Sequence, residues 1–198
     1  RSTQGYSSAA SDVYKRQLSA FLALDSYVEL TGAGRLPLAE FVDMGYVRDV
    51  IEHVVVVKHD YRASYEAVRK AATDFPSLNV TAAWWDNSWH VTVGARPLRA
   101  TLLQGEACGL IGKQPSEDEL RALAASVRAL SYGTNLWGSA DYRRRISAPL
   151  AVQAVRRAAG IELSAALARE LETVQVPKFA TDEYSCRRVP GVDSSEVR

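Results

Sequence analysis

The spacing of apolar residues in this 198-residue chain changes near residue 116, and this change limits the folds that the chain can adopt. Before that point apolar residues alternate with polar ones, as at Trp89, Val91 and Val93, which is typical of half-buried strands. Beyond it they recur every three or four residues, as in helices with one buried face. Strands followed by helices predict an α+β fold.

The first part of the chain contains several predicted strands. They cover residues 27–30, 49–58, 64–70, 77–85, 89–93 and 99–103. Asp86 and Asn87 separate two of these strands and are typical of a hairpin turn. The continuous β-branched run within 49–58 predicts a buried strand. Residues 31–34 are interpreted as a glycine turn, and residues 36–41 as a connector with a helical turn.

The helical part begins with a capping-box sequence. Ser116 and Glu119 stand three residues apart, so that each side chain can bond the backbone amide of the other. A second helix is predicted from Ser139, and Pro149 within it predicts a kink or a break, because proline removes one backbone hydrogen bond. A third amphipathic helix is predicted over 161–173, after a short one at 106–111.

These patterns divide the chain into four segments. Residues 1–17 are interpreted as a non-native or disordered leader, because residues 11–17 look like translated sequencing-adapter sequence. Residues 18–58 form a first unit. Residues 60–174 form a second, an antiparallel three- or four-stranded sheet followed by a small helical bundle. Residues 175–198 are a tail without periodicity. The chain is therefore expected to be a fragment of a longer protein.

Composition excludes several functions. The net charge of +1 gives no electrostatic basis for binding nucleic acid. The longest apolar run, residues 54–57, is too short to span a membrane. Two distant cysteines, Cys108 and Cys186, cannot hold an iron–sulfur cluster or a structural zinc alone, and they indicate a reduced, cytoplasmic protein. No spacing joins the three histidines to a metal or acid–base site, so no catalytic or metal-binding residue is predicted.

Four stretches resemble one protein family. Residues 138–145 read Gly-Ser-Ala-Asp-Tyr-Arg-Arg-Arg, and residues 22–41, 65–80 and 94–100 precede them in the same order as in that family. Over about 18–160 the chain resembles the C-terminal half of the FAD-binding medium subunit of molybdenum hydroxylases, of the xanthine dehydrogenase and carbon monoxide dehydrogenase type. The resemblance implies the fold of the carbon monoxide dehydrogenase flavoprotein C-terminal domain, preceded by a remnant of the α/β FAD-binding domain.

The resemblance also implies a function. The complete subunit would relay electrons from the iron–sulfur clusters of a small partner subunit through FAD to an acceptor such as NAD or a quinone. A large partner subunit would hold molybdopterin. Phe75, flanked by Asp74, matches an aromatic residue that covers the isoalloxazine ring of FAD, Asn79 matches a polar position near the ring edge, and Ile51 matches an aliphatic residue packed on the ring.

Several alternatives remain open at this stage. Phe75 and Ile51 also suit core positions, and Asn79 suits the end of a strand. Tyr142 is expected to face inward, while Arg143–Arg145 are expected either to pair with carboxylates of a partner or to form a solvated basic face. The glycine-rich loops that hold the FAD pyrophosphate in the family are expected upstream, so this fragment is expected to bind FAD poorly, and a subunit-interaction module without flavin is the alternative function.

Overall fold

A computed structural model of the chain describes residues 17–44, 48–71 and 74–171. It contains two antiparallel sheets, one with the strand order β2-β1-β3 and one with the order β4-β5-β6-β7. The strands are β1 (Ser26–Leu30), β2 (Gly34–Pro37), β3 (Ile51–Val56), β4 (Arg62–Val68), β5 (Leu78–Trp85), β6 (Ser88–Gly94) and β7 (Thr101–Gln104). The labelled helices are α2 (Leu38–Asp43), η1 (Gly105–Ala107), α3 (Glu117–Ala129), α4 (Ala140–Ala159) and α5 (Ala165–Leu171). This arrangement confirms the predicted α+β class.

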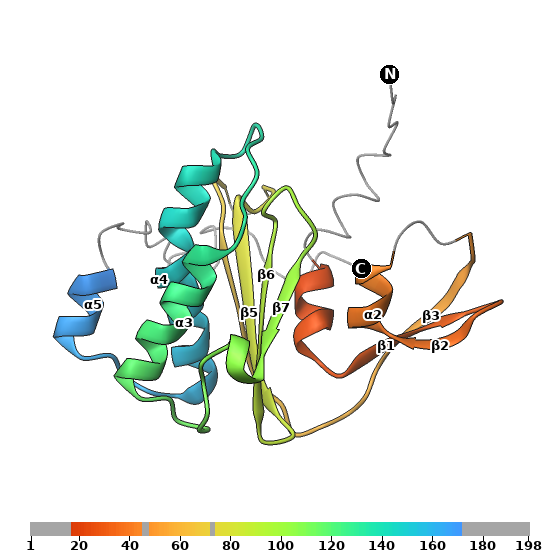
Figure 1. Cartoon of the computed structure of the whole chain (residues 1–198), viewed down its shortest axis with the longest axis horizontal. Helices are drawn as coiled ribbons and strands as arrows, with labels where there is room; N and C mark the ends of the chain where they lie inside the picture. Colours follow the sequence, from red (N-terminus) through yellow and green to blue (C-terminus); the bar gives the residue numbers. More distant parts are fainter. Residues whose placement is uncertain (1–16, 45–47, 72–73, 172–198) are drawn as a thin grey trace, which may run out of the picture.

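The four-stranded sheet lies in the middle of the molecule. Figure 1 shows α3 and α4 on one side of it, and the three-stranded sheet with the helix at residues 17–23 on the other. The predicted hairpin is present, because Asp86 and Asn87 join β5 to β6 with φ angles of 50° and 54°. Two successive positive φ angles give the turn a twist that matches that of the flanking strands.

The larger core lies between this sheet and the helices. Alternate residues of β5 and β6, among them Val80 and Val91, are fully buried against apolar side chains of α3 and α4 such as Leu123 and Val155. The sheet supplies these side chains with a period of two and the helices with a period near 3.6. The apolar stripe predicted for 120–130 is therefore the face of α3 that contacts the core.

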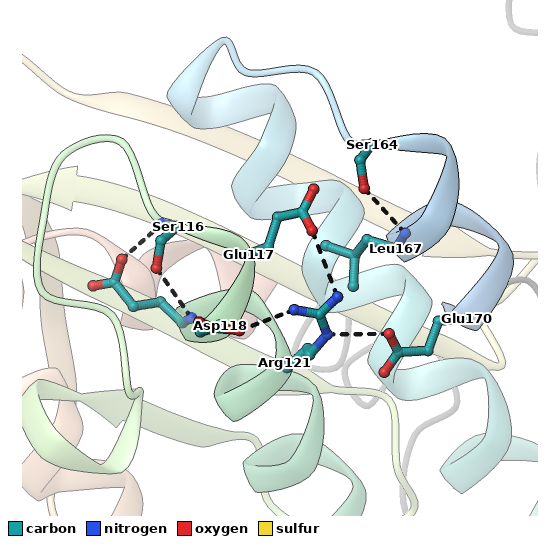
Figure 2. Close-up of polar contacts among 8 residues, drawn as sticks. Ser116, Glu117, Asp118, Arg121, Ser164, Leu167 and Glu170 are labelled. Atoms are coloured by element: carbon teal, nitrogen blue, oxygen red, sulfur yellow. Dashed lines mark hydrogen bonds and ion pairs between the residues drawn. The ribbon is translucent and has the colours of Figure 1, made fainter.

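The capping box at the start of α3 is also confirmed. Ser116 Oγ accepts from the Glu119 amide at 3.3 Å, and the Glu119 carboxylate accepts from the Ser116 amide at 2.7 Å. Figure 2 shows that Arg121, one turn further along α3, pairs with Glu117 and Asp118 of its own helix and reaches Glu170 of α5 at 3.1 Å. These ion pairs join α3 to α5 at the surface.

Two helical predictions need correction. The third helix begins at Ala165 rather than near 161, because Ser164 Oγ accepts from the Leu167 amide and caps the helix there. The second helix is not broken at Pro149, since α4 runs through it to Ala159. One missing amide is tolerated in a 20-residue helix whose buried face is packed on β4 and β5. The short helix predicted at 106–111 is only the 3₁₀ turn η1.

Residues 17–43 and β3 build the smaller unit. Leu22, Val28, Leu30 and Leu38 form its buried cluster. Residues 34–37, predicted as turn and connector, form the edge strand β2, because Gly34 with a φ of 73° turns the chain back onto β1. Whether this unit is a remnant of an α/β FAD-binding domain stays a prediction, as do the limits of the two domains.

The strand predicted at 49–58 is present as β3, but the prediction that it is buried is wrong. Ile51 and Val54 are 45% and 47% exposed. They pair with Leu30 and Val28 of β1 and therefore lie on the same face as those buried residues. The face is uncovered at this end because β3 is an edge strand of a sheet whose packed apolar residues lie nearer β1 and α2.

The second face of the larger sheet packs on the helix at 17–23. A Cβ added to Gly94 would lie 2.4 Å from Asn79 Oδ1 and 3.0 Å from Ser19 Cβ, so only a glycine fits where that helix crosses β5 and β6. Trp85 Nε1 donates to the Ala23 carbonyl at 3.0 Å and adds a second link. Of the helices in the described ranges, none combines the length and the apolar character needed to cross a bilayer.

Candidate functional site

Arg143 is the most unusual residue of the larger unit, because its charged side chain has no exposed surface. It stands in the first turn of α4, which Ser139 caps by accepting from the Tyr142 amide at 3.1 Å. Burial lowers the pKa of the Arg143 guanidinium, yet arginine remains protonated in proteins. A buried cation must be surrounded by acceptors to be stable.

Those acceptors are carbonyl and amide oxygens of two loops. Nε of Arg143 donates to the Ser77 carbonyl at 2.7 Å, and Nη1 donates to the Gly133 carbonyl at 2.8 Å. The guanidinium also donates to the Gly138 carbonyl and to Asn135 Oδ1. One side chain therefore holds the residues before β5 against the loop that precedes α4.

Each of the two loops carries an aromatic residue. Phe75 lies just before β5 and Trp137 just before α4, with ring centroids 5.3 Å apart and planes at 61°. Ser77 Oγ donates to the Trp137 carbonyl at 2.8 Å, which adds a second bond between the loops. Both rings are half-buried. The pair is an edge-to-face contact that retains exposed aromatic surface.

The signature at 138–145 is thus oriented differently from the prediction. Tyr142, expected to face inward, is 37% exposed, whereas Arg143, expected on a solvated or partner-binding face, is buried. Arg144 does lie at the surface, where it pairs with Asp141 at 3.2 Å. The signature stabilises two loops of its own chain, because Arg143 finds its acceptors in backbone carbonyls rather than in carboxylates.

The predicted flavin-contacting residues lie in two places. Asp74, Phe75 and Asn79 lie at one end of β5, where Asp74 Oδ1 accepts from the Phe75 amide at 2.7 Å. Asn79 is fully buried, facing Ser19 and Gly94, so a ring could reach it only if the helix at 17–23 shifted. Ile51 belongs to the other sheet. The role of all four in binding flavin stays a prediction.

The glycine turn at 31–34 already binds an anion within the chain. The Asp49 carboxylate accepts from the amide of Gly32 at 3.0 Å and from the amide of Ala33 at 2.8 Å. These backbone hydrogen bonds lower the pKa of Asp49. With its amides occupied, the turn offers no place for a phosphate group.

The sequence analysis missed the roles of Arg143, Ser77 and Trp137. One signal was available, since Tyr142 and Arg143 adjoin in the first turn of α4 and only one of them can face Ile146 and the core. Within the described ranges, no three His, Cys, Asp or Glu side chains gather as a possible metal site.

Comparison with solved structures places this fold among oxidoreductases of the molybdenum hydroxylase type. A chain of quinoline 2-oxidoreductase from Pseudomonas putida 86 is similar with a TM-score of 0.62 and 14% identity, covering 76% of this chain and 59% of that chain. A chain of carbon monoxide dehydrogenase from Hydrogenophaga pseudoflava is similar with a TM-score of 0.62 and 16% identity, covering 74% and 58%.

A chain of the Cu,Mo-containing carbon monoxide dehydrogenase is similar at a TM-score of 0.61 and 17% identity, covering 77% of this chain and 59% of that one. The present chain thus spans less than three fifths of the length of these neighbours. At such identities the likeness shows a shared fold. Neither a protein-family model nor the sequence of a curated protein matches the chain.

Proposed function

We propose that residues 18–171 belong to the FAD-binding subunit of a molybdenum hydroxylase and form one wall of the pocket for the isoalloxazine ring. The observation that carries this proposal is the Phe75–Trp137 pair, which Arg143 holds between two loops. It occurs in a chain with the fold of carbon monoxide dehydrogenase and quinoline oxidoreductase chains. A rigid, partly exposed aromatic pair suits the face of a planar ring.

The residues of this chain fit the ring of FAD better than its phosphates. Phe75 retains exposed surface, whereas the amides of Gly32 and Ala33 are bonded to Asp49. Phosphate binding needs free backbone amides, as in the glycine-rich loops expected upstream. In this proposal the phosphates of FAD are held by a part of the subunit outside this chain.

Each residue near the proposed wall then has a distinct role. Phe75 covers the ring and excludes water, and Asp74 fixes the turn by accepting from the Phe75 amide. Arg143 is a positioning residue, because it holds Ser77 and the loop of Trp137 without reaching the ring itself. Ile51 supplies apolar contact from the smaller sheet. FAD, when bound, would supply the redox chemistry.

The proposed subunit is one component of a cytoplasmic electron-transfer complex. Electrons would enter from the iron–sulfur clusters of a small partner subunit and leave to NAD or a quinone. The substrate would be oxidised at molybdopterin in a large partner subunit. The isolated chain would have no activity, since it holds neither the phosphate-binding part nor the partner cofactors.

Retention of flavin is the direct test. Residues 18–171 are joined behind the segment of a carbon monoxide dehydrogenase flavin subunit that they do not cover, and the purified chimera is mixed with FAD and desalted. We expect the chimera to retain the visible spectrum of oxidised flavin and the isolated chain to lose it. A folded chimera that retains no flavin would remove the proposal.

The alternative is an interaction module that holds no flavin, and the exposed apolar edge at β3 favours it. Val50, Ile51 and Val54 are all largely exposed on that edge. An apolar patch of this kind often marks a contact with another protein. Under this alternative Ile51→Asp abolishes assembly with the other subunits, while Phe75→Ala leaves both assembly and the flavin spectrum of the complex unchanged.

A further inference from the structure

A second cavity lies between the two units of the fold, at the far end of β5 from Phe75. Its volume is about 130 Å³, and it is bounded by β1 and α2 on one side and by β5, β6 and β7 on the other. Leu22, Leu38 and Leu102 supply much of its apolar wall. Eight residues of β5 separate it from Phe75, a distance of about 23 Å.

Two polar side chains in the wall have no partner. Ser26 Oγ and His90 Nδ1 are buried atoms without a hydrogen bond, and each residue is only 8% exposed. Ser26 enters from β1 and His90 from β6, so the two polar atoms belong to opposite walls of one cavity. Buried polar groups in folded proteins nearly always find a partner. An occupant that bonds both would satisfy them.

The charges around the cavity favour an uncharged occupant. Asp25 is in the lining and pairs with His59 Nε2 at 2.7 Å, and none of the lining residues, all within the described ranges, is Lys or Arg. Burial lowers the pKa of His90, although Asp25, Asp86 and the Ser88 carbonyl act in the other direction. A carboxylate beside a neutral imidazole disfavours anions.

One wall of the cavity is rigid. Trp85 is stacked between two imidazoles, with centroid distances of 5.2 Å to His59 and 4.2 Å to His90. Its indole Nε1 is bonded to the Ala23 carbonyl. The stack fixes the imidazole of His90 in position, so its unpartnered nitrogen is held ready for a ligand rather than free to turn away.

We propose that this cavity is a binding site for a small, uncharged nitrogen heterocycle that carries one hydrogen-bond donor and one acceptor. An apolar cavity of roughly 150 Å³ holds a benzene molecule, so the volume here suits a single five-membered ring. Ser26 Oγ and His90 Nδ1 recognise the two polar atoms of the ring. The site is independent of flavin and of the proposed function at Phe75.

Pyrazole is the probe for this site, because it is uncharged at neutral pH and has one donor and one acceptor nitrogen. It is titrated into the ¹⁵N-labelled full chain, and the imidazole nitrogen signals of His90 are followed by NMR. We expect a saturable shift of those signals. Benzene, which matches the size but not the polarity, and acetate, which is anionic, are expected to bind at least about fivefold more weakly.

Ser26→Ala is compared with Thr92→Val as a matched control. Thr92 lies on the same face of the sheet and also has a buried hydroxyl without a partner, but it does not line the cavity. We expect Ser26→Ala to raise the dissociation constant of pyrazole about fivefold and Thr92→Val to change it less than about twofold.

Three results would overturn the proposal. One is the absence of a saturable shift in the unmodified chain, which means that water alone fills the cavity. Another is benzene binding as tightly as pyrazole. The third is an equal effect of the two substitutions. If Ser26→Ala fails to fold, the His90 signals of the unmodified chain still decide between binding and no binding.

Discussion

Arg143 of α4 donates through Nε to the carbonyl of Ser77 at 2.7 Å, although 66 residues separate them in the sequence. This bond joins the first turn of a helix to the residues just before β5. It places Phe75 beside Trp137 and so creates the aromatic pair on which the flavin proposal depends.

Replacing Arg143 is expected to destabilise the protein strongly. Arg143→Ala leaves the carbonyls of Ser77 and Gly133 without a buried donor, and we expect a loss of about 3–5 kcal/mol in the free energy of unfolding. Arg144→Ala is the control, because Arg144 is exposed and pairs only at the surface, so its removal should cost under about 1 kcal/mol. Urea unfolding measures both, and equal losses would contradict the role given to Arg143.

Gly94 is expected to tolerate no side chain. Gly94→Ala places a Cβ 2.4 Å from Asn79 Oδ1 and 3.0 Å from Ser19, at the crossing of the two units, and we expect it to cost about 1–3 kcal/mol. At Gly112 the nearest atoms to an added Cβ are 3.8 Å away, so Gly112→Ala should be nearly neutral. Thermal unfolding compares the two variants. A Gly94→Ala protein as stable as the parent would show that the helix at 17–23 does not pack there.

Acid is expected to weaken the fold through His90. Burial lowers the pKa of His90 in the folded state below its unfolded value, so the unfolded chain binds the proton more readily. The contribution of His90 to stability is therefore complete above an unfolded pKa of about 6.5 and is lost as the pH falls from there to the folded value. Urea unfolding at several pH values should show a shallower decline in His90→Gln than in the parent. The same decline in both would contradict this assignment.

Cys108 is expected to be chemically inert in the folded protein. It has no exposed surface, and burial raises the pKa of its thiol to about 12. The thiolate is the reactive form of cysteine, so labelling by a thiol reagent at pH 8 should be negligible until denaturant is added. Mass spectrometry of the peptide that contains Cys108 reports this residue separately from Cys186. Rapid labelling without denaturant would show that η1 and α3 do not cover it.

Local features of the fold could be predicted because they depend on neighbouring residues. The Asp86–Asn87 turn and the Ser116 capping box involve residues at most three apart, and both are present. The order of strands and helices followed from hydrophobic period alone. Strand β2 was missed because Gly34 and Pro37 weaken a strand pattern, and only its pairing with β1 establishes it.

Burial was harder to predict because it depends on distant parts of the chain. A β-branched run such as β3 is typical of a buried strand, but its exposure is decided by whether other elements cover the sheet edge. Likewise, three adjacent arginines indicate a charged surface. Arg143 is buried only because loops at residues 77 and 133–138 bring carbonyls to it, and no spacing within α4 announces them.

The dissociation constant of FAD from the chimera tests the central claim most directly, when Phe75→Ala is compared with Tyr27→Ala. Tyr27 is an aromatic residue of the smaller sheet that packs under Arg35. If Phe75 covers the isoalloxazine ring, Phe75→Ala raises this constant about fivefold, the equivalent of about 1 kcal/mol, while Tyr27→Ala leaves it within about twofold. An unchanged constant in a folded Phe75→Ala chimera would contradict the account.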